Sequence, residues 1–183
     1  VTFGPAGGSY RQKQERGEDM AVPEQERDRF CRVLHEGRTS LYRLALSITR
    51  NSADAQEAVA EAVCRACERY HQLRERDKLP QWLLRITANE SRRLCRKRER
   101  TVPLDTLPQE PADPAQALPD LSLWQAVQSL PRDQREAVVL FYYEDLPAEE
   151  IARIVGASPG AVRVRLSRAR SKLRELLKEG EDG

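Results

Sequence analysis

Apolar residues recur at spacings of three and four along both halves of the chain, which is the period of amphipathic helices. In the N-terminal half this pattern predicts helices over residues 27–50, 52–70 and 81–100. Gly37 is the expected break in the first segment, which the pattern leaves as one helix or two. Ser52 is the expected N-cap of the second helix, because Asp54 and Glu57 follow it near the positive end of the helix dipole.

The segment 101–120 differs in kind from these helices, because it holds prolines at 103, 108, 111, 114 and 119 together with several acidic residues. Proline removes a backbone donor and fixes φ, so we expect a semi-extended linker here. The sequence therefore predicts two helical modules joined by an acidic, proline-rich linker. The expected boundaries are a disordered extension over 1–24, a first module over 25–100, the linker over 101–120 and a second module over 121–179.

The end of the second module has the pattern of a helix–turn–helix. A short helix over residues 147–155 is followed by Gly156, which suits a sharp turn with positive φ. Ser158 is a good N-cap and Pro159 suits the first turn of the next helix. That helix has one apolar seam, formed by Val162, Leu166, Ala169, Leu173 and Leu176. Its other faces are rich in arginine, as expected for a helix in the DNA major groove, with Arg163 a candidate for guanine.

This module resembles the C-terminal promoter-binding domain of extracytoplasmic-function sigma factors, which direct bacterial RNA polymerase to promoters. The resemblance rests on the Leu-Pro opening of LPRDQREAVVLFYYEDLPAEEIARIVGASPGAVRVRLSRARSKLRELL, on EEIARIVGAS within it and on the helix GAVRVRLSRARSKL. It implies a sigma region 4 that binds the −35 element and packs on the flap of the polymerase β subunit. It also implies that DNA is contacted by Ser158, Pro159, Gly160, Ala161, Arg163, Val164, Ser167 and Arg168.

The first module resembles sigma region 2 of the same family. The segment NSADAQEAVAEAVCRACERY is similar to the family helix that docks on the polymerase β′ coiled coil, and this implies polymerase contacts from Asp54, Gln56, Glu57 and Glu61. The segment LPQWLLRITANESRRLCRKRER is similar to the helix that binds the −10 element. The residues this implies in −10 binding are Trp82, Asn89, Arg92, Arg93, Arg96 and Lys97. The polar loop 70–78 lies where the family captures a flipped −10 base, which implies that Tyr70 also contacts the −10 element. Several basic side chains in one tract would make DNA affinity fall steeply with salt.

Composition and motifs argue against a membrane protein, a secreted protein and an enzyme. The formal net charge is only +2, so the charge distribution says more than the total. No apolar run approaches the ~20 residues that span a bilayer, and the N-terminus lacks a secretory signal, so we expect a cytoplasmic protein with reduced cysteines and no stable membrane insertion. Neither a catalytic set nor a phosphate-binding glycine loop is present, which predicts no enzyme activity and no cofactor.

The spacing Cys64-x-x-Cys67, with His71 four residues on, raises zinc binding as an alternative, and Cys31 or His35 could complete such a site. Buried thiols without metal are the interpretation we prefer, because the family fills these positions with apolar side chains. Thiol redox sensing is a further alternative, since exposure decides the reactivity of a cysteine.

Taken together, the sequence predicts an all-α protein of two small domains, the second a helix–turn–helix (winged-helix-like) DNA-binding domain. The predicted function is a sigma factor that binds core RNA polymerase and directs promoter-specific initiation at −35 and −10 elements. The resemblance implies core polymerase, promoter DNA and an anti-sigma factor as partners. Two alternatives stay open: a standalone helix–turn–helix transcriptional regulator, and a helical adaptor that sequesters a partner.

Overall fold

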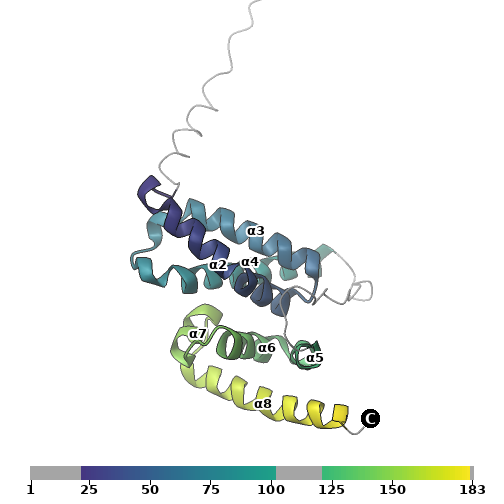
Figure 1. Ribbon diagram of the computed structural model, residues 1–183. Coiled ribbons are helices and arrows are strands. Elements are labelled where there is room, and N and C mark those ends of the chain that lie inside the picture. Colours follow the sequence, from purple (N-terminus) through teal and green to yellow (C-terminus); the bar gives the residue numbers. More distant parts are fainter. Residues whose placement is uncertain (1–21, 102–120, 182–183) are drawn as a thin grey trace, which may run out of the picture.

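The computed structural model describes residues 22–101 and 121–181, and these residues are almost entirely helical (Figure 1). The predicted all-α class is confirmed, and no strand occurs in the described residues. Most of the predicted N-terminal extension and nearly all of the predicted linker lie outside them. No helix among the described residues combines the length and the apolar character that a membrane crossing requires.

Three long helices form the first module: α2 (Glu24–Thr49), α3 (Ser52–Glu68) and α4 (Leu79–Thr101). Two 3₁₀ turns join the last two helices: η1 (Tyr70–Gln72) and η2 (Arg76–Lys78). The inner face of α3 is made of alanines at spacings of three and four, namely Ala55, Ala58, Ala62 and Ala66, all of them buried. Because alanine is small, this face lets α3 lie close against α2 and α4.

Two local predictions for this module are wrong. Gly37 does not break the first helix, since α2 runs unbroken through it and packs its apolar face on the core along both halves. The N-cap of α3 is Asn51 rather than Ser52. The Asn51 side chain accepts a hydrogen bond from the backbone N–H of Asp54 (2.9 Å), and Asn51 has the extended backbone of an N-cap.

The second module contains α5 (Leu121–Ser129), α6 (Arg132–Val138), α7 (Ala148–Val155) and α8 (Pro159–Glu181). A π turn, η5 (Val139–Tyr143), extends α6 and was not predicted. Gly156 ends α7 with φ +68°, and the hydroxyl of Ser158 accepts a hydrogen bond from the N–H of Ala161 (3.1 Å). The predicted helix–turn–helix, with its glycine turn and serine cap, is therefore confirmed in its backbone.

The two modules pack directly against each other. In Figure 1, α6 and α7 lie between the first module and α8, which runs along the far side. Helix α7 contacts α4, and α6 and η5 contact α2. The exposed side of α8 therefore faces away from the first module, while the side of α4 next to α6 and α7 is covered.

Candidate nucleic-acid interface

Helix α8 separates a buried seam from an exposed polar face. Val162, Leu166 and Ala169 are almost fully buried against α6 and α7. Pro159 and Ala161 are half-buried. The predicted −35 residues that are exposed are Ser158, Gly160, Arg163, Val164, Ser167 and Arg168. An exposed, cationic helix face that begins at a capped N-terminus has the geometry of a helix that enters the major groove.

Acidic residues of neighbouring helices orient two arginines on α8. Arg163 forms an ion pair with Glu149 at the start of α7. The Nε atom of Arg165 lies 3.3 Å from Oδ2 of Asp133 in α6. Both pairs cross from α8 to an element that supports it, so they fix the angle at which the arginine side chains leave the helix.

Val164 is an exception on this face, because it is a large aliphatic residue that is 48% exposed. It lies one residue after Arg163 and one turn before Arg168, on the side of α8 away from the buried seam. Gly160 lies one turn earlier and leaves open space, since a Cβ there would meet only the Ser158 hydroxyl at 3.9 Å. Thymine is the one base that offers a methyl group in the major groove, and an aliphatic side chain suits it.

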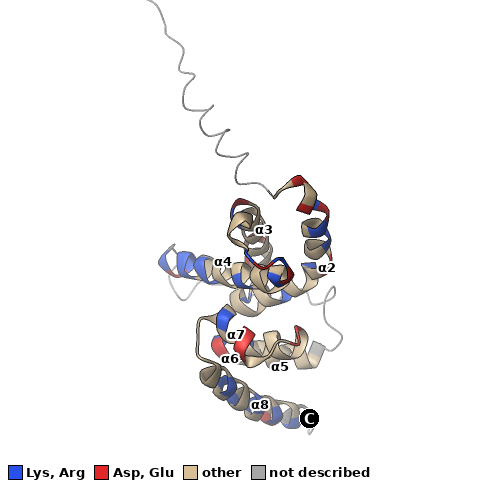
Figure 2. Cartoon of the chain, turned by 90° about the vertical axis from the view of Figure 1, so that its left-hand side faces the viewer, with Lys and Arg blue, Asp and Glu red and all other residues tan. Residues whose placement is uncertain are grey.

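The second basic surface lies on the C-terminal half of α4, where Figure 2 shows lysine and arginine in blue. A hollow of about 310 Å³ is lined by Arg93, Arg96, Lys97 and Arg100. Arg96 and Lys97 are exposed. Arg93 is tied by Nε to Glu90 (2.6 Å) and by Nη2 to Glu61 (3.5 Å). The positive charge of this hollow suits the phosphate backbone of DNA.

Two other predicted −10 residues, Asn89 and Arg92, do not line this hollow. Asn89 is exposed and its amide oxygen accepts a weak bond from Arg92 (3.4 Å). Arg92 also donates to the carboxylate of Glu136 in α6, and its side chain is only 18% exposed. Trp82 is half-buried and packs on the core. The structure therefore brings Arg93, Arg96 and Lys97 together but holds Arg92 at the contact between the modules.

Tyr70 was predicted to contact DNA, and the structure corrects this, because its ring is 1% exposed and cannot stack on a base. The ring packs edge-on against Phe30 (centroids 5.5 Å apart) and under the guanidinium of Arg76 (4.5 Å). The Tyr70 hydroxyl donates to the carboxylate of Glu26, and this hydrogen bond is the main cause of a lowered Glu26 pKa. Tyr70 is therefore a core residue that anchors the start of α2.

The predicted polymerase-binding residues of α3 divide into two groups. Gln56 and Glu57 are exposed and Glu61 is half-buried, so all three can reach a partner. Asp54 is 5% exposed, and its Oδ1 lies 2.8 Å from Nη2 of Arg98. Burial raises the pKa of Asp54, and the Arg98 charge opposes that shift. In this arrangement Asp54 joins α3 to the end of α4.

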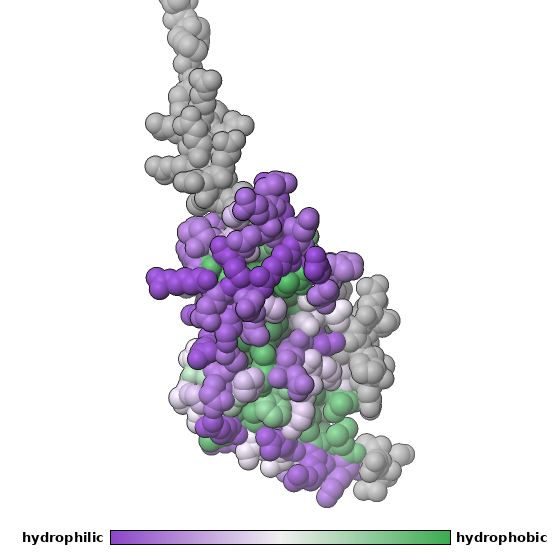
Figure 3. Space-filling model, turned by 60° about the vertical axis from the view of Figure 1, so that its left-hand side comes forward, coloured by the Kyte–Doolittle hydropathy of each residue, from purple (hydrophilic) through white to green (hydrophobic). Residues whose placement is uncertain are grey.

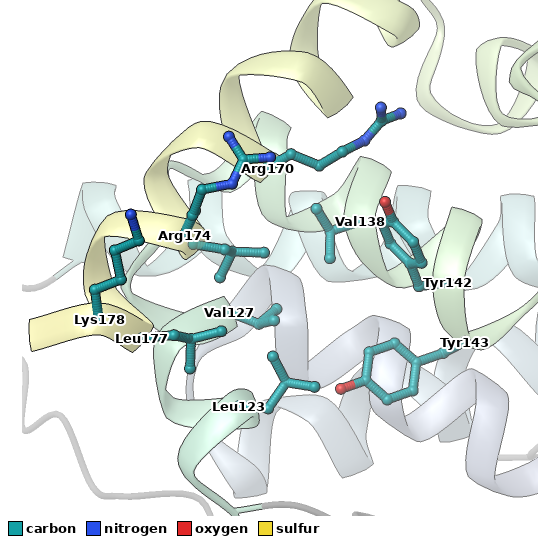
Figure 4. Close-up of a pocket in the computed structure, with 10 residues that line it drawn as sticks. Leu123, Val127, Val138, Tyr142, Tyr143, Arg170, Arg174, Leu177 and Lys178 are labelled. Atoms are coloured by element: carbon teal, nitrogen blue, oxygen red, sulfur yellow. The ribbon is translucent and has the colours of Figure 1, made fainter. Parts of the chain in front are cut away.

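An apolar groove on the second module was not predicted. Figure 4 shows it between α5, η5 and the C-terminal half of α8, with a volume of about 600 Å³. Its floor and walls are lined by Leu123, Val127, Val138, Tyr142, Tyr143, Leu173 and Leu177, and its rim by Arg170, Arg174 and Lys178. Figure 3 shows apolar surface in green on this module beside hydrophilic atoms. The sequence signal was Leu177, one residue beyond the predicted seam of α8.

The cysteines do not support the zinc alternative. Cys31 and Cys64 are exposed and Cys67 is half-buried, so the expectation of buried thiols is wrong for Cys64. His71 is exposed as well. Within residues 22–101 and 121–181, no three cysteine, histidine or acidic side chains are grouped as a metal site requires. Burial raises the pKa of Cys67, which makes its thiol less reactive.

Comparison with known proteins identifies related families for both modules. Residues 35–101 match sigma-70 region 2, and residues 120–173 match sigma-70 region 4. The chain is 35% identical over 144 residues to the ECF RNA polymerase sigma factor EcfG of Rhodopseudomonas palustris, covering 75% of this chain and 79% of EcfG. It is 30% identical over 141 residues to the RNA polymerase sigma factor SigV of Bacillus subtilis, covering 75% of this chain and 85% of SigV.

A third relative is longer than this chain. RfaY of Xanthomonas campestris, named as a probable RNA polymerase sigma factor, is 30% identical over 161 residues, which cover 81% of this chain but 40% of RfaY. Among solved structures, the sigma factor RpoE in complex with the anti-sigma factor NepR from Bartonella quintana matches with a TM-score of 0.67 and 27% identity. That match covers 85% of this chain and 98% of RpoE. CnrH in complex with the cytosolic domain of CnrY has a TM-score of 0.62 at 24% identity, which supports the fold alone.

Proposed function

This chain belongs to the extracytoplasmic-function sigma factors of the sigma-70 family, which act in promoter-specific transcription initiation, and we propose that its two modules divide promoter recognition between them. The first module binds the −10 element and the second binds the −35 element, while the chemistry of RNA synthesis belongs to the polymerase. The observation that carries this proposal is the exposed cationic face of α8, which follows the Gly156 turn.

The −35 contacts come from the exposed residues of α8. Arg163, oriented by Glu149, donates to a guanine edge, and Arg168 contacts backbone or base one turn further along. Ser158 and Gly160 lie at the helix N-terminus, where free N–H groups favour a phosphate oxygen. Val164 lies between these polar contacts and meets the methyl group of a thymine.

The −10 contacts come from the hollow on α4. Arg93, Arg96 and Lys97 line it together with Arg100, and this concentration of charge supports binding to phosphates of duplex or opened DNA. Asn89 is exposed on the same helix and offers an amide for a base edge. Two weak DNA surfaces on one chain gain affinity from each other when promoter spacing allows both to bind.

Core polymerase is the proposed partner of two further surfaces. Gln56, Glu57 and Glu61 on α3 form an acidic face that suits docking on the β′ coiled coil. The groove beside Leu177 suits an amphipathic helix from the β flap, because its floor is apolar and its rim is cationic. An anti-sigma factor that covers either surface would inhibit the protein. We also propose that the protein works in the cytoplasm, where bacterial RNA polymerase acts.

Transcription in vitro with purified core polymerase tests this function. Core polymerase with the chain should start RNA at defined promoter positions, and core polymerase alone should not. A gel shift with and without core polymerase separates this function from that of a standalone regulator, which would bind its promoter tightly by itself. RNA that starts at no defined position, or a chain that does not bind core polymerase, would overturn the proposal.

A further inference from the structure

An exposed stripe runs along α3 on the side away from the alanines that pack on the core. Gln56 and Glu57 begin the stripe, and Ala60, Cys64 and Glu68 follow at spacings of three and four, all of them exposed. The main helix contacts of α3 are with α2 and α4, and Figure 1 shows α3 on the side of the first module opposite the second module. The stripe is therefore accessible to solvent and to a partner.

The residues around Cys64 fix its side chain on the outer side of α3. Ala62 and Ala66 are buried against the core, and Nε of Arg65 lies 2.6 Å from Oε1 of Glu90 in α4. Because successive helix positions differ by about 100°, Cys64 lies about 160° around the helix from both alanines. The packing that holds α3 in place therefore points the Cys64 thiol into solvent.

Cys64 belongs to a group of three cysteines on α2 and α3. Cys31 and Cys64 are exposed, whereas Cys67 is half-buried and packs on the core. Burial is the main cause of the raised pKa of Cys67, and the charges of Cys64 and Cys31 add to it, so the three thiols lie near enough to interact. Core packing explains a thiol at Cys67, which behaves as a small apolar residue. It does not explain Cys64, whose side chain is open to reagents in solution.

The chemistry open to such a thiol is exchange with a disulfide. The thiolate of Cys64 attacks one sulfur of a low-molecular-weight disulfide, forms a mixed disulfide with it and releases the other half as a thiolate. The disulfide is the oxidant, because its released half takes the electron pair of the broken S–S bond. Excess low-molecular-weight thiol reverses the exchange, so the extent of modification follows the ratio of disulfide to thiol in solution.

An adduct on Cys64 would lie on the surface that the proposed function assigns to core polymerase. Cys64 follows Glu57 by seven residues and Glu61 by three, so the three residues share one side of α3. Ala60 lies one turn before Cys64 and is exposed, and its small side chain lets a partner helix approach closely. A tripeptide-sized group on Sγ of Cys64 fills the space that such a helix needs.

We propose that Cys64 is a modification site, at which a low-molecular-weight cysteinyl thiol is attached as a reversible mixed disulfide and prevents α3 from docking on core polymerase. This inference rests on the proposed function, because it describes the regulation of one of its surfaces. Oxidising conditions remove the chain from polymerase and leave the face of α8 unchanged, and reduction returns it. Cys31 accepts the same group, but it lies on α2, outside the stripe.

Two chains with one cysteine each test this site. In one chain Cys31, Cys67 and Cys95 are replaced by serine, so that only Cys64 remains, and in the matched control only Cys31 remains. Each chain is treated with glutathione disulfide until mass spectrometry shows one adduct per chain. The adduct on Cys64 should weaken binding to core polymerase by at least about tenfold, and reductant should restore it. The adduct on Cys31 should leave this affinity unchanged, and both modified chains should bind a −35 duplex like their reduced forms.

Protection by polymerase supplies a second measurement. Excess core polymerase should slow the reaction of Cys64 with glutathione disulfide by at least about tenfold, because a covered thiol is not attacked. The reaction of Cys31 should keep its rate, and mass spectrometry of this chain follows both. If Cys64 reacts equally fast in the free and the bound chain, it lies outside the docking surface and the inference is wrong.

These outcomes separate the modification site from the proposed function. If neither reduced chain binds core polymerase, the proposed function is wrong. If the reduced chains bind and the adduct on Cys64 changes nothing, or if Cys64 forms no adduct, the modification site is wrong while the function stands. Equal losses for adducts on Cys31 and Cys64 would show that any bulky group on the first module interferes, and this result would also overturn the assignment to Cys64.

Discussion

Arg163 at the start of α8 forms an ion pair with Glu149 at the start of α7, so the helix that we propose to face DNA is tied to the helix that supports it. Their side chains are 62% and 53% exposed, so the pair contributes little to folding. The ion pair instead affects the orientation of the Arg163 side chain, because a carboxylate on one side of the guanidinium limits the directions in which Arg163 can approach a base. In the proposed complex, Glu149 would also place negative charge close to the DNA phosphates.

The variant Glu149→Gln should therefore bind DNA more tightly but discriminate less. We expect the free energy of unfolding to change by less than about 0.5 kcal/mol. Affinity for a scrambled duplex should rise, while the ratio of −35 to scrambled affinity should fall by about threefold, since a well-oriented bidentate arginine supplies that discrimination. Glu175→Gln, an exposed acid further along α8, is the control. An unchanged ratio would mean that Glu149 acts through its charge alone.

The proposed contact between Val164 and a thymine methyl group can be tested by removing that methyl group alone. Each thymine of the −35 duplex is replaced in turn by uracil, which removes only the methyl group. At one position the replacement should weaken binding by about 1 kcal/mol, roughly fivefold, from the lost apolar contact. The variant Val164→Ala should show a similar loss on the thymine duplex and no further loss on the uracil duplex. If the binding losses from Val164→Ala and from uracil were additive at every thymine, Val164 would not contact a thymine methyl group.

Local sequence signals predicted the helix–turn–helix well, because each signal acts within a few residues. Gly156 has the positive φ that its turn requires, and Ser158 caps the helix that follows. Gly37 misled the prediction, since the apolar face of α2 packs on the core and outweighs the low helix propensity of one glycine. Asn51 caps α3 in place of the adjacent Ser52, a shift of one residue that local propensity does not resolve.

Features that join distant residues were not predicted. Arg135 and Ser47 are 88 positions apart, and Arg43 and Glu144 are 101 apart, so no helical period links them. Tyr70 was assigned to DNA because it begins the polar loop 70–78, where the family captures a flipped −10 base, yet a buried ring with one hydrogen-bond partner fits that position equally well. Tertiary packing decides which side of a helix the other module covers. Local patterns in a single sequence do not reveal that packing.

The contact between Tyr70 and Glu26 predicts how stability depends on pH. The hydroxyl of Tyr70 and the charge of Arg76 lower the Glu26 pKa below its ordinary value of 4.5. A lowered pKa in the folded state stabilises the protein above the ordinary pKa, and this contribution is lost as pH falls through the lowered value. Tyr70→Phe removes the largest cause and should raise the Glu26 pKa toward 4.5, which carboxyl-carbon NMR can follow.

Urea unfolding of the Tyr70→Phe variant should therefore show a stability deficit near pH 7 that narrows as pH falls below the ordinary carboxyl pKa of 4.5, because the wild-type contact is then lost as well. Because the Tyr70 ring is buried and cannot stack on a base, Tyr70→Phe should bind a −10 oligonucleotide as tightly as the wild type does. Tyr70→Ala, which also removes the ring, is compared with Tyr70→Phe in the same binding measurement at a pH where both variants are folded. A deficit that stays constant with pH would show that Glu26 is not the partner that matters.

The groove beside Leu177 gives the last prediction, because it separates polymerase docking from DNA binding on one module. Leu177 is 40% exposed and lies beside Arg174 and Lys178, so Leu177→Asp should cost little stability. It should weaken binding to an isolated β-flap fragment by at least about tenfold, since it removes an apolar contact and places a negative charge in a groove proposed to bind an apolar helix face. Leu177→Gln should lose less affinity for the flap fragment, because it removes the apolar contact but adds no charge. Binding to a −35 duplex should stay unchanged in both variants, and equal flap affinity for Leu177→Asp and the wild type would move the docking site away from this groove.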